Sequence, residues 1–290
     1  MEGMDNMTVG SLAGVTFDRV ADAFLQAFAD YGMKLDRDSL SDMFRRRGAR
    51  FDLSYAAFDG DRIVSFIING IGVHNGRLTA YDTGTGTVKE YRGLGLTDRI
   101  FAGSLGFLRA AGVESCLLEV LKENVPAVKI YTRLGFETMR GFDCYNACNM
   151  DVLGRLAEAR GGCVEIRPIE AGEVGGMAGF MDFCPSWQNS IGSIMRNKEA
   201  FLCVGAFKGG VPVGFGVSET AYGDITLLAV DRNHRRQGIG SALLKTLVEN
   251  NRADRAKVLN VEENQGPAKS FLTASGFEFS CGQYEMARQL

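Results

Sequence analysis

The chain of 290 residues contains few of the side chains that build metal and disulfide sites. It has only two histidines, and its seven cysteines include no C-x-x-C pair. Cys144 and Cys148 lie four residues apart, with no second pair of ligands nearby. This pattern argues against a zinc site and against a disulfide framework, and it favours free thiols in a reducing compartment. We therefore expect no bound metal.

The sequence also lacks the features of a membrane protein or a nucleic-acid-binding protein. No run of about 18 apolar residues is present, and the first five residues are acidic and polar, unlike a secretory leader. With 32 basic and 35 acidic residues and a net charge of −3, the chain has no excess positive charge to displace counterions from nucleic acid. These absences predict a cytoplasmic protein that binds neither membranes nor nucleic acid.

An internal repeat is the most informative feature that the chain does contain. Residues 91–97 (Tyr-Arg-Gly-Leu-Gly-Leu-Thr) are similar to residues 234–240 (His-Arg-Arg-Gln-Gly-Ile-Gly), with an offset of 143. Residues 126–136 and 267–277 form a second similar pair, with an offset of 141. Because two separate motifs share nearly one offset, we infer a duplication. The content of 46% hydrophobic residues is ample for buried cores.

Apolar periodicity predicts the same order of elements in each half. In the first half we predict a short strand at 7–12, helices at 16–30 and 38–47, strands at 50–58, 62–72 and 77–88, a helix at 95–111, a strand at 115–121, a helix at 125–134 and a closing strand. In the second half we predict a strand at 164–169, helices at 170–182 and 186–196, strands at 201–207, 211–218 and 224–230, a helix at 238–250, a strand at 257–261, a helix at 267–275 and a closing strand.

This order predicts an α/β (α+β) fold in each half, with a mixed, mostly antiparallel sheet flanked by helices. We expect an N-terminal domain at 1–150 and a C-terminal domain at 163–290. Residues 151–162 are charged and rich in alanine and end in two glycines, which is typical of a linker.

A glycine-rich loop follows the third long strand of each half. In the second half, Arg235-x-x-Gly238-x-Gly240 precedes a leucine-rich helix. Such a turn exposes unpaired backbone N–H groups at the positive end of a helix dipole, which suits a pyrophosphate. A Walker loop is excluded because Ser-Ala follows Gly240, and a dinucleotide fingerprint is excluded because the third glycine position is Leu243, or Asp98 in the first half. A surface turn that merely caps a helix is the alternative.

Together these features resemble the GNAT superfamily of acyl-CoA-dependent N-acyltransferases. The loop with its preceding Ala-Val is similar to the family's acyl-CoA signature, and so is the first-half motif Asn124-x-x-Ala127-x-x-x-Tyr131-x-x-x-Gly135-Phe136. The resemblance covers both halves and nearly the whole chain. It implies two tandem domains that use acetyl-CoA, or another acyl-CoA, as co-substrate. The acceptor would be a small-molecule or peptide amine.

The resemblance also implies which residues bind acyl-CoA. In the first half these are Thr87, Val88, Arg92, Gly93, Leu94, Gly95, Leu96, Thr97 and Asn124. In the second half they are Ala229, Val230, Arg235, Arg236, Gln237, Gly238, Ile239 and Gly240. A backbone N–H near Thr87-Val88 or Val230 would polarise the thioester carbonyl. Asn124 is expected either to bond the pantetheine amides or to hold the local backbone.

The chemistry needs a proton donor for the departing thiolate and a deprotonated amine. Tyr131 is the predicted donor, and packing under the Gly-Phe turn is its alternative role. Three strand carboxylates, Asp82, Glu119 and Asp224, are candidate general bases, and loss of the amine proton to water is the alternative.

Each half departs from the family pattern. Thr97 stands where the pattern has glycine or alanine, whereas Leu272 and Gln265 stand where the first half has Tyr131 and Asn124. We therefore expect an N-acetyltransferase with its chemistry in the first half. Chemistry in the second half is a variant of this hypothesis. A non-catalytic acyl-CoA-binding or scaffold protein is the alternative from another class.

Overall fold

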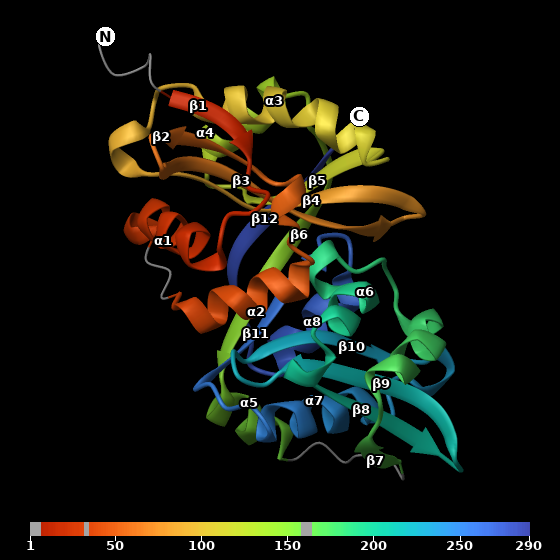
Figure 1. Ribbon diagram of the computed structural model, residues 1–290. Helices are drawn as coiled ribbons and strands as arrows, with labels where there is room; N and C mark the ends of the chain where they lie inside the picture. Colours follow the sequence, from red (N-terminus) through yellow and green to blue (C-terminus); the bar gives the residue numbers. More distant parts are fainter. Residues whose placement is uncertain (1–6, 32–34, 158–163) are drawn as a thin grey trace. The chain divides into compact units, whose positions relative to one another are not determined.

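The computed structural model describes residues 7–31, 35–157 and 164–290 (Figure 1). Contacts divide the chain into two compact units. Unit 1 comprises Met1–Val120, Asn124–Met139 and Glu285–Leu290, and unit 2 comprises Leu121–Glu123 and Arg140–Tyr284. Neither unit is contiguous in sequence, because each contains a segment from the other half of the repeat. The contiguous domains at 1–150 and 163–290 stay a prediction.

Unit 1 is a sheet with helices on both faces. Its strands are β1 (Met7–Ser11), β2 (Tyr55–Asp59), β3 (Arg62–His74), β4 (Arg77–Thr87), β5 (Ser115–Leu121), the start of β6 (Glu137–Cys148) and the end of β12 (Glu278–Gln289). Its helices are α1 (Phe17–Ala27), α2 (Arg37–Arg47), α3 (Leu96–Ala110) and α4 (Val125–Arg133), with 3-10 turns η1 (Ala29–Tyr31), η2 (Phe51–Leu53) and η3 (Lys89–Tyr91).

The strands of unit 1 follow the order β1-β2-β3-β4-β5, with β12 beside β5. Neighbours are antiparallel from β1 to β4, whereas β4 and β5 are parallel. On one face, α1 and α2 bury an aromatic cluster in which the Phe24 ring stacks on Phe66 and meets Phe44 edge-on. Helix α3 covers the opposite face (Figure 1) and buries Leu96 and Ile100 against it.

Unit 2 repeats this plan with shorter helices on one face. Its strands β7 (Glu165–Pro168), β8 (Phe201–Lys208), β9 (Val211–Glu219), β10 (Asp224–Val230) and β11 (Arg255–Glu262) follow the order β6-β11-β10-β9-β8-β7. Its helices are α5 (Asn149–Leu156), α6 (Ile191–Arg196), α7 (Ile239–Glu249) and α8 (Gly266–Ala274), with 3-10 segments η4 (Ala171–Phe180), η5 (Trp187–Asn189), η6 (Lys198–Ala200) and η7 (Arg232–His234). The predicted mixed sheets flanked by helices are confirmed.

Four local predictions differ from the structure. The expected helix at 186–196 is the 3-10 turn η5 followed by the short helix α6, which begins at Ile191. The expected helix at 170–182 is the 3-10 segment η4, because glycines stand at 172, 175, 176 and 179 and each costs about 1 kcal/mol in an α-helix. The expected strand at 50–58 starts as η2, and β2 begins at Tyr55. The expected linker at 151–162 begins inside α5, whose Val152 and Leu156 are buried in the core of unit 2. The rest of that linker, from 158 onward, lies outside the described residues.

The cysteines within the described ranges are free thiols. Burial raises the pKa of the Cys116 thiol to about 12, so this thiol stays protonated at neutral pH. Cys163 and the first five residues lie outside the described part of the chain. Across that part, no helix combines the length and the apolar character that a membrane crossing requires.

Candidate functional site

The two parallel strands of unit 1 separate partway along their length. Strands β4 and β5 are paired from Thr79–Ser115 to Tyr81–Leu117, and both strands continue beyond the last pair. We call the diverging segments, residues 82–87 of β4 and 118–121 of β5, the unit 1 splay. Within the described ranges, no strand pairs with the inner edges of these segments, so a ligand can take the place of one.

Asp82 is the first residue of the splay on β4. Its Oδ2 accepts a hydrogen bond of 2.6 Å from Thr85 Oγ1 and one of 3.1 Å from the Tyr131 hydroxyl. Its Oδ1 is buried and has no hydrogen-bond partner in the described part of the chain. Burial raises the pKa of Asp82 from 3.8 to about 6, and the two hydrogen bonds oppose the rise. A carboxyl with this pKa exchanges its proton near neutral pH, as a general base must.

A β-bulge directs Asp82 toward α4. Across the β3–β4 pair, Asn69 faces Asp82 whereas Ile68 faces Gly84, so β4 carries one extra residue between them. A Cβ on Gly84 would meet the Phe24 ring of α1, which places Gly84 on the α1 face. Asp82 lies on the other face, where its carboxylate meets the hydroxyl that α4 presents.

Helix α4 holds Tyr131 in this position. Asn124 is its N-cap, and Oδ1 of Asn124 accepts a hydrogen bond of 3.2 Å from Ala127 N, so this side chain holds the local backbone. The Tyr131 ring also packs edge-on against Phe136, with 5.8 Å between centroids. Both roles considered for Tyr131 are therefore compatible: the ring packs under the turn, and the hydroxyl reaches the splay.

Glu119 lies in the splay on the opposite face from Asp82. Leu117 is paired with Tyr81, and Glu119 follows two residues later on the same face of β5. Tyr81 in turn faces Gly70, where a Cβ would meet the backbone of Arg47 at the end of α2. Of the two carboxylates predicted as bases in the first half, Asp82 is the one that accepts the Tyr131 hydrogen bond.

The predicted phosphate loop of unit 1 is a left-handed turn that opens α3. Gly93 and Gly95 have φ values of +80° and +67°, and a Cβ on either would meet nothing within 4 Å. Within the described residues, no backbone hydrogen bond is donated by the N–H groups of residues 93–97. Leu96 is buried and anchors the first turn of the helix, and the Thr97 N–H lies in that turn. The loop therefore presents several N–H donors at a helix N-terminus, as an anion site requires.

The side chain of the arginine in this loop, Arg92, is bonded to other residues of the protein. Arg92 donates from Nε to Thr87 O (3.1 Å) and from NH2 to Ala27 O (2.9 Å), and its NH1 pairs with Asp30 at 3.2 Å. The side chain thus ties the end of β4 to the end of α1. Arg92, predicted as a phosphate ligand, has its donors engaged in this bracing role.

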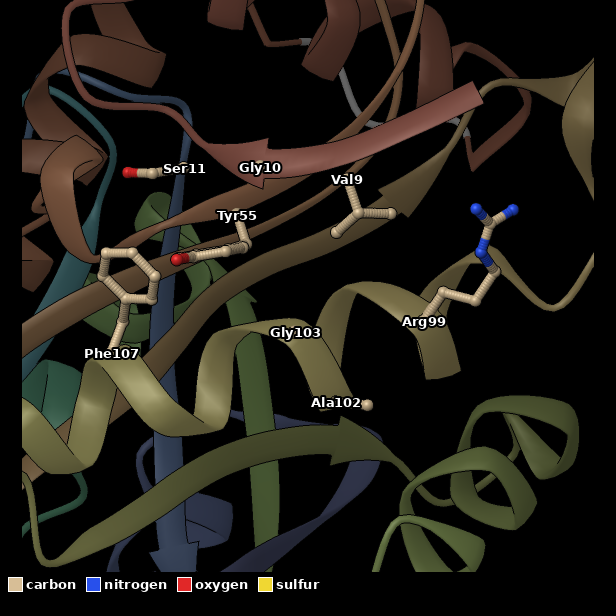
Figure 2. A pocket seen from close by; sticks show the side chains of 8 residues that line it. All are labelled: Val9, Gly10, Ser11, Tyr55, Arg99, Ala102, Gly103 and Phe107. Carbon is tan, nitrogen blue, oxygen red and sulfur yellow. The ribbon is translucent and has the colours of Figure 1, made fainter. Parts of the chain in front are cut away.

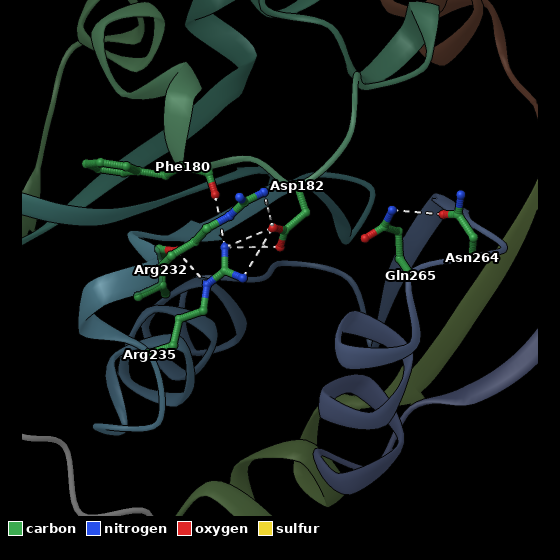
Figure 3. A network of polar contacts seen from close by, with 7 residues as sticks. Phe180, Asp182, Arg232, Arg235, Asn264 and Gln265 are labelled. Atoms are coloured by element: carbon green, nitrogen blue, oxygen red, sulfur yellow. Dashed lines mark hydrogen bonds and ion pairs between the residues drawn. The ribbon is translucent and has the colours of Figure 1, made fainter.

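Unit 2 repeats this bracing arrangement (Figure 3). Arg235 donates from Nε to Val230 O (2.9 Å) and from NH2 to Phe180 O (3.3 Å), and it pairs with Asp182 at 3.0 Å. Arg232 contacts the same carboxylate at 3.2 Å. The two bracing arginines, Arg92 and Arg235, therefore join the ends of equivalent strands to equivalent crossing segments.

The phosphate loop of unit 2 has the same backbone course. Arg236 occupies a left-handed conformation (φ +61°) where the first half has Gly93, and Gly238 (φ +79°) is the N-cap of α7. Ile239 is buried, and Oε1 of Gln237 accepts a bond of 3.3 Å from Lys208 Nζ. A Cβ on Gly240 would lie 3.6 Å from Phe271, in ordinary contact. A Cβ at this position is therefore no steric obstacle to the turn.

The inner edge of β4 presents the N–H of Thr87 and not that of Val88. Val88 N donates to Val64 O at 2.9 Å, so the expectation that this N–H polarises a thioester fails for Val88. Antiparallel neighbours alternate in direction, so Thr87 N–H points to the open edge. In unit 2 the bond from Asp231 N to Val213 O (2.9 Å) likewise leaves the Val230 N–H on the open edge. Ala229, one residue earlier, directs its N–H toward β9.

Unit 2 has apolar residues at the two positions where unit 1 has its acid and base groups. Strands β10 and β11 are paired at Asp224–Lys257 and then diverge, so a splay exists here too. Ile225 stands where the first half has Asp82, and Leu272, where it has Tyr131, is buried in the core. Asp224, the base predicted for this half, pairs with the ammonium group of Lys257 at 3.1 Å. The structure thus brings a carboxylate and a phenol together in unit 1, whereas apolar side chains take both places in unit 2.

A depression on unit 1 lies apart from Asp82 and Tyr131. It runs along α3 between β1 and β2, and its lining includes Val9, Tyr55, Arg99, Gly103 and Phe107 (Figure 2). None of the residues that line it belongs to the splay or to the glycine turn. It therefore has no part in the site described above.

Comparisons with known proteins agree with this geometry. The model of the Acetyltransferase (GNAT) family matches residues 17–136 and 172–277. N-alpha-acetyltransferase 30 of Schizosaccharomyces pombe is 35% identical over 86 residues, which are 29% of this chain and 57% of that protein. A tandem GNAT protein from the clavulanic acid biosynthesis pathway superposes with a TM-score of 0.72 at 15% identity, over 98% of both chains. A putative acetyltransferase from Pyrococcus horikoshii gives 0.69 at 15% identity, over 99% of this chain and 90% of that one.

A mixed sheet with a splayed parallel pair and a glycine turn that opens a helix is present in both units. The family match covers each half of the repeat and most of the chain. This chain belongs to the Acetyltransferase (GNAT) family, with two such domains in tandem. The resemblance that the motifs indicated is confirmed.

Proposed function

We propose that this protein transfers an acetyl group from acetyl-CoA to a primary amine, and that the chemistry takes place in unit 1. The observation that carries this proposal is the hydrogen bond between the Tyr131 hydroxyl and the buried carboxylate of Asp82 at the start of the splay. The glycine turn at residues 93–97 supplies the N–H donors for the pyrophosphate. The Thr87 N–H, on the open edge of β4, would donate to the thioester carbonyl.

The paired groups account for the movement of one proton. As the amine nitrogen forms its bond to the acetyl carbon, Asp82 takes the proton that the nitrogen loses. As the carbon–sulfur bond breaks, Tyr131 gives its phenolic proton to the departing thiolate of CoA. The proton on Asp82 then passes along the 3.1 Å hydrogen bond to the Tyr131 oxygen. Both side chains return to their starting states, and the products are an amide and CoA.

Unit 2 would bind acyl-CoA without reacting. It keeps the left-handed turn at Arg236–Gly238 and the open N–H of Val230, which serve binding. It has Ile225 and Leu272 in place of the base and the acid. Under this assignment the non-catalytic role belongs to unit 2 alone and not to the whole chain.

Calorimetry together with an acceptor screen tests the proposal. The full chain is titrated with acetyl-CoA, and release of CoA thiol and formation of amide are followed with a panel of amines. The panel includes a peptide with a free N-terminus, because the S. pombe relative is named an N-alpha-acetyltransferase. Acceptor-dependent thiol release matched by amide supports transfer. Tight binding of acetyl-CoA with no transfer to any amine would instead favour a binding or scaffold protein.

A further inference from the structure

The bulge in β4 brings Asp82 and Thr85 to the same face of the sheet. In a regular strand, residues three positions apart lie on opposite faces. Thr83 is the extra residue in the β3–β4 pair, and Gly84, which follows it, lies on the α1 face. Thr85 therefore returns to the face of Asp82, where its Oγ1 donates the 2.6 Å hydrogen bond to Asp82 Oδ2.

The two hydrogen bonds that side chains donate to Asp82 end on the same oxygen. The hydroxyls of Thr85 and Tyr131 both donate to Oδ2, at 2.6 and 3.1 Å. Oδ1 is buried and has no hydrogen-bond partner among the described residues. A hydrogen bond stabilises the charge on the oxygen that accepts it, so the oxygen without one is the more basic of the two. A proton that Asp82 takes up therefore binds to Oδ1.

The bond from Thr85 has the largest effect of any hydrogen bond on the pKa of Asp82. Burial raises this pKa to about 6, and the Thr85 bond is the first of the effects that lower it. Smaller lowering effects come from the Tyr131 bond, a backbone bond at Gly84 and the charge of Arg47. Loss of the Thr85 hydroxyl should therefore raise the pKa of Asp82 above about 6.

The other titratable groups that interact with Asp82 keep the same charge near neutral pH. The charge of Asp82 acts on Cys116, whose pKa is raised to about 12, and on Tyr81, whose pKa is raised well above 10. Both stay neutral, and an arginine such as Arg47 keeps its charge throughout. A step in activity near pH 6 that moves when Thr85 is changed therefore reports on the carboxyl of Asp82.

Unit 2 has the same bulge, but apolar side chains surround it. Thr226 is the extra residue in the β9–β10 pair, at the position equivalent to the bulge of unit 1. The positions of Asp82, Thr85 and Tyr131 in unit 1 are occupied in unit 2 by Ile225, Leu228 and Leu272. Two of these apolar residues are buried in the core of unit 2, and Leu228 packs against that core. The hydroxyl of residue 85 thus occurs together with the carboxylate and the phenol, and all three polar groups are replaced together.

We infer that Thr85 is a positioning residue of the proposed reaction, which holds Asp82 by Oδ2 and leaves Oδ1 to take the proton of the acceptor amine. This inference rests on the proposed function. As the bond between nitrogen and the acetyl carbon forms, the amine passes its proton to Oδ1, directly or through one water. A half-turn of the neutral carboxyl group about its Cβ–Cγ bond exchanges the two oxygens and brings this proton to Tyr131, whose own proton has left with the thiolate. Thr85 itself neither gains nor loses a proton.

The substitution Thr85→Val tests the inference, because it removes the hydroxyl and keeps the shape of the side chain. With the full chain, acetyl-CoA and an amine that accepts the acetyl group, kcat and kcat/KM are measured from about pH 5 to about pH 9. We expect the step in kcat/KM to lie about one pH unit higher, because a hydrogen bond to a charged oxygen is lost. On the plateau kcat should fall by about tenfold, because the carboxylate is no longer held in place. The KM for acetyl-CoA should stay within about twofold, because the glycine turn is unchanged.

Two matched variants separate the role of the hydroxyl from a general effect on the strand. Thr85→Ser keeps a hydroxyl at this position, so the step should stay near pH 6 and kcat within about threefold of the wild-type value. Thr79→Val removes a hydroxyl from the same strand outside the splay, where Thr79 Oγ1 lies 2.9 Å from Ser115 Oγ. This variant should also keep the step near pH 6. The carbon-13 NMR signal of the Asp82 carboxyl measures the same titration without substrate.

Circular dichroism checks that each variant folds. Should Thr85→Val fail to fold, Thr85→Ala removes the same hydroxyl and decides the question. A folded variant that loses activity equally at every pH, or whose step does not move, would overturn the inference and leave the proposed function standing. A wild-type chain that transfers acetyl to no amine would count against both.

Discussion

The hydroxyl of Tyr131 donates a hydrogen bond of 3.1 Å to the buried carboxylate of Asp82. The two residues come from different elements, the C-terminal half of α4 and the bulge of β4. Their contact couples the group that gives a proton to the group that takes one. The same bond lowers the pKa of Asp82 against the larger effect of burial. A change in either residue should therefore be visible in the behaviour of the other.

Replacing Tyr131 by Phe tests the proposed acid. We expect kcat to fall by about 10²-fold, the usual contribution of a positioned proton donor, with little change in the Kd for acetyl-CoA. The pKa of Asp82 should also rise above about 6, because a hydrogen bond that lowers it is lost. Steady-state kinetics over a range of pH measures both effects. Tyr145→Phe is the matched control, since its hydroxyl contacts Asp143 in unit 2, and unchanged turnover in Tyr131→Phe would remove the assignment to unit 1.

The pKa of Asp82 predicts how activity depends on pH. A base must be deprotonated to accept a proton, so kcat/KM should rise with pH through about 6 and approach a plateau above it. Asp82→Asn cannot take the proton, and its lower activity should lack this step. Both proteins are measured with the same acceptor, so that the titration of the amine itself cancels in their ratio. A ratio that does not vary between pH 5 and 8 would contradict the role of Asp82.

The sequence predicted the duplication, the mixed sheets and the glycine turns because these depend on local patterns. Two motifs with nearly one offset identified the repeat, and positive φ at Gly95 and Gly238 follows from residue type and position. Which candidate base meets Tyr131 could not be predicted, because a one-residue bulge at Thr83 decides the face of β4 on which Asp82 lies. No local pattern marks that bulge.

The role of the loop arginines was also beyond the sequence. From the sequence, an arginine beside a phosphate-binding turn could either bind the phosphates or hold neighbouring segments of the protein together. Which role it has depends on hydrogen-bond acceptors that lie far away in the chain. For Arg92 these are Ala27 O and Asp30.

The two bracing arginines should contribute to stability more than to binding of acetyl-CoA. Arg92→Ala leaves the carbonyls of Ala27 and Thr87 without this donor, and Arg235→Ala does the same to Phe180 and Val230. Hydrogen bonds from charged donors contribute about 1.5–3 kcal/mol each, so urea unfolding should show a clear loss in each variant. Arg236→Ala is not a matched case, because its φ is positive. Arg252→Ala is the control, because this exposed side chain makes no hydrogen bond or ion pair with the described residues. A large loss of acetyl-CoA affinity with unchanged unfolding would instead assign these arginines to the phosphates.

The glycines of the loops should differ in their tolerance of a methyl group. Gly95→Ala and Gly238→Ala place a side chain in a left-handed conformation, which costs about 1–2 kcal/mol and disturbs the turn that presents the N–H donors. Gly240→Ala should be tolerated, because its Cβ would lie 3.6 Å from Phe271 in ordinary contact. Calorimetry with acetyl-CoA should show weaker binding in the first two variants, and only at the loop that was changed. Equal effects from all three substitutions would argue against the left-handed turn as the cause.

The end of the chain should be required for unit 1, even though it belongs to the second half of the repeat. Arg288 donates to Leu134 O and its guanidinium lies 5.1 Å from the Phe101 ring, while Leu290 N bonds Glu114 O. Deletion of residues 285–290 would leave β5 with an unpaired edge and uncover the turn that follows α4.

We expect this deletion to lower the midpoint of urea unfolding and to abolish transfer, because β5 forms one side of the splay. Arg288→Ala should cause a smaller loss of the same kind, and Glu278→Gln, on the exposed start of the same strand, should cause none. Hydrogen exchange would locate the effect, with faster exchange expected in β5 and α4 and little change in β8 and β9. A shortened chain that unfolds like the full chain would show that the stability of unit 1 does not depend on residues 285–290.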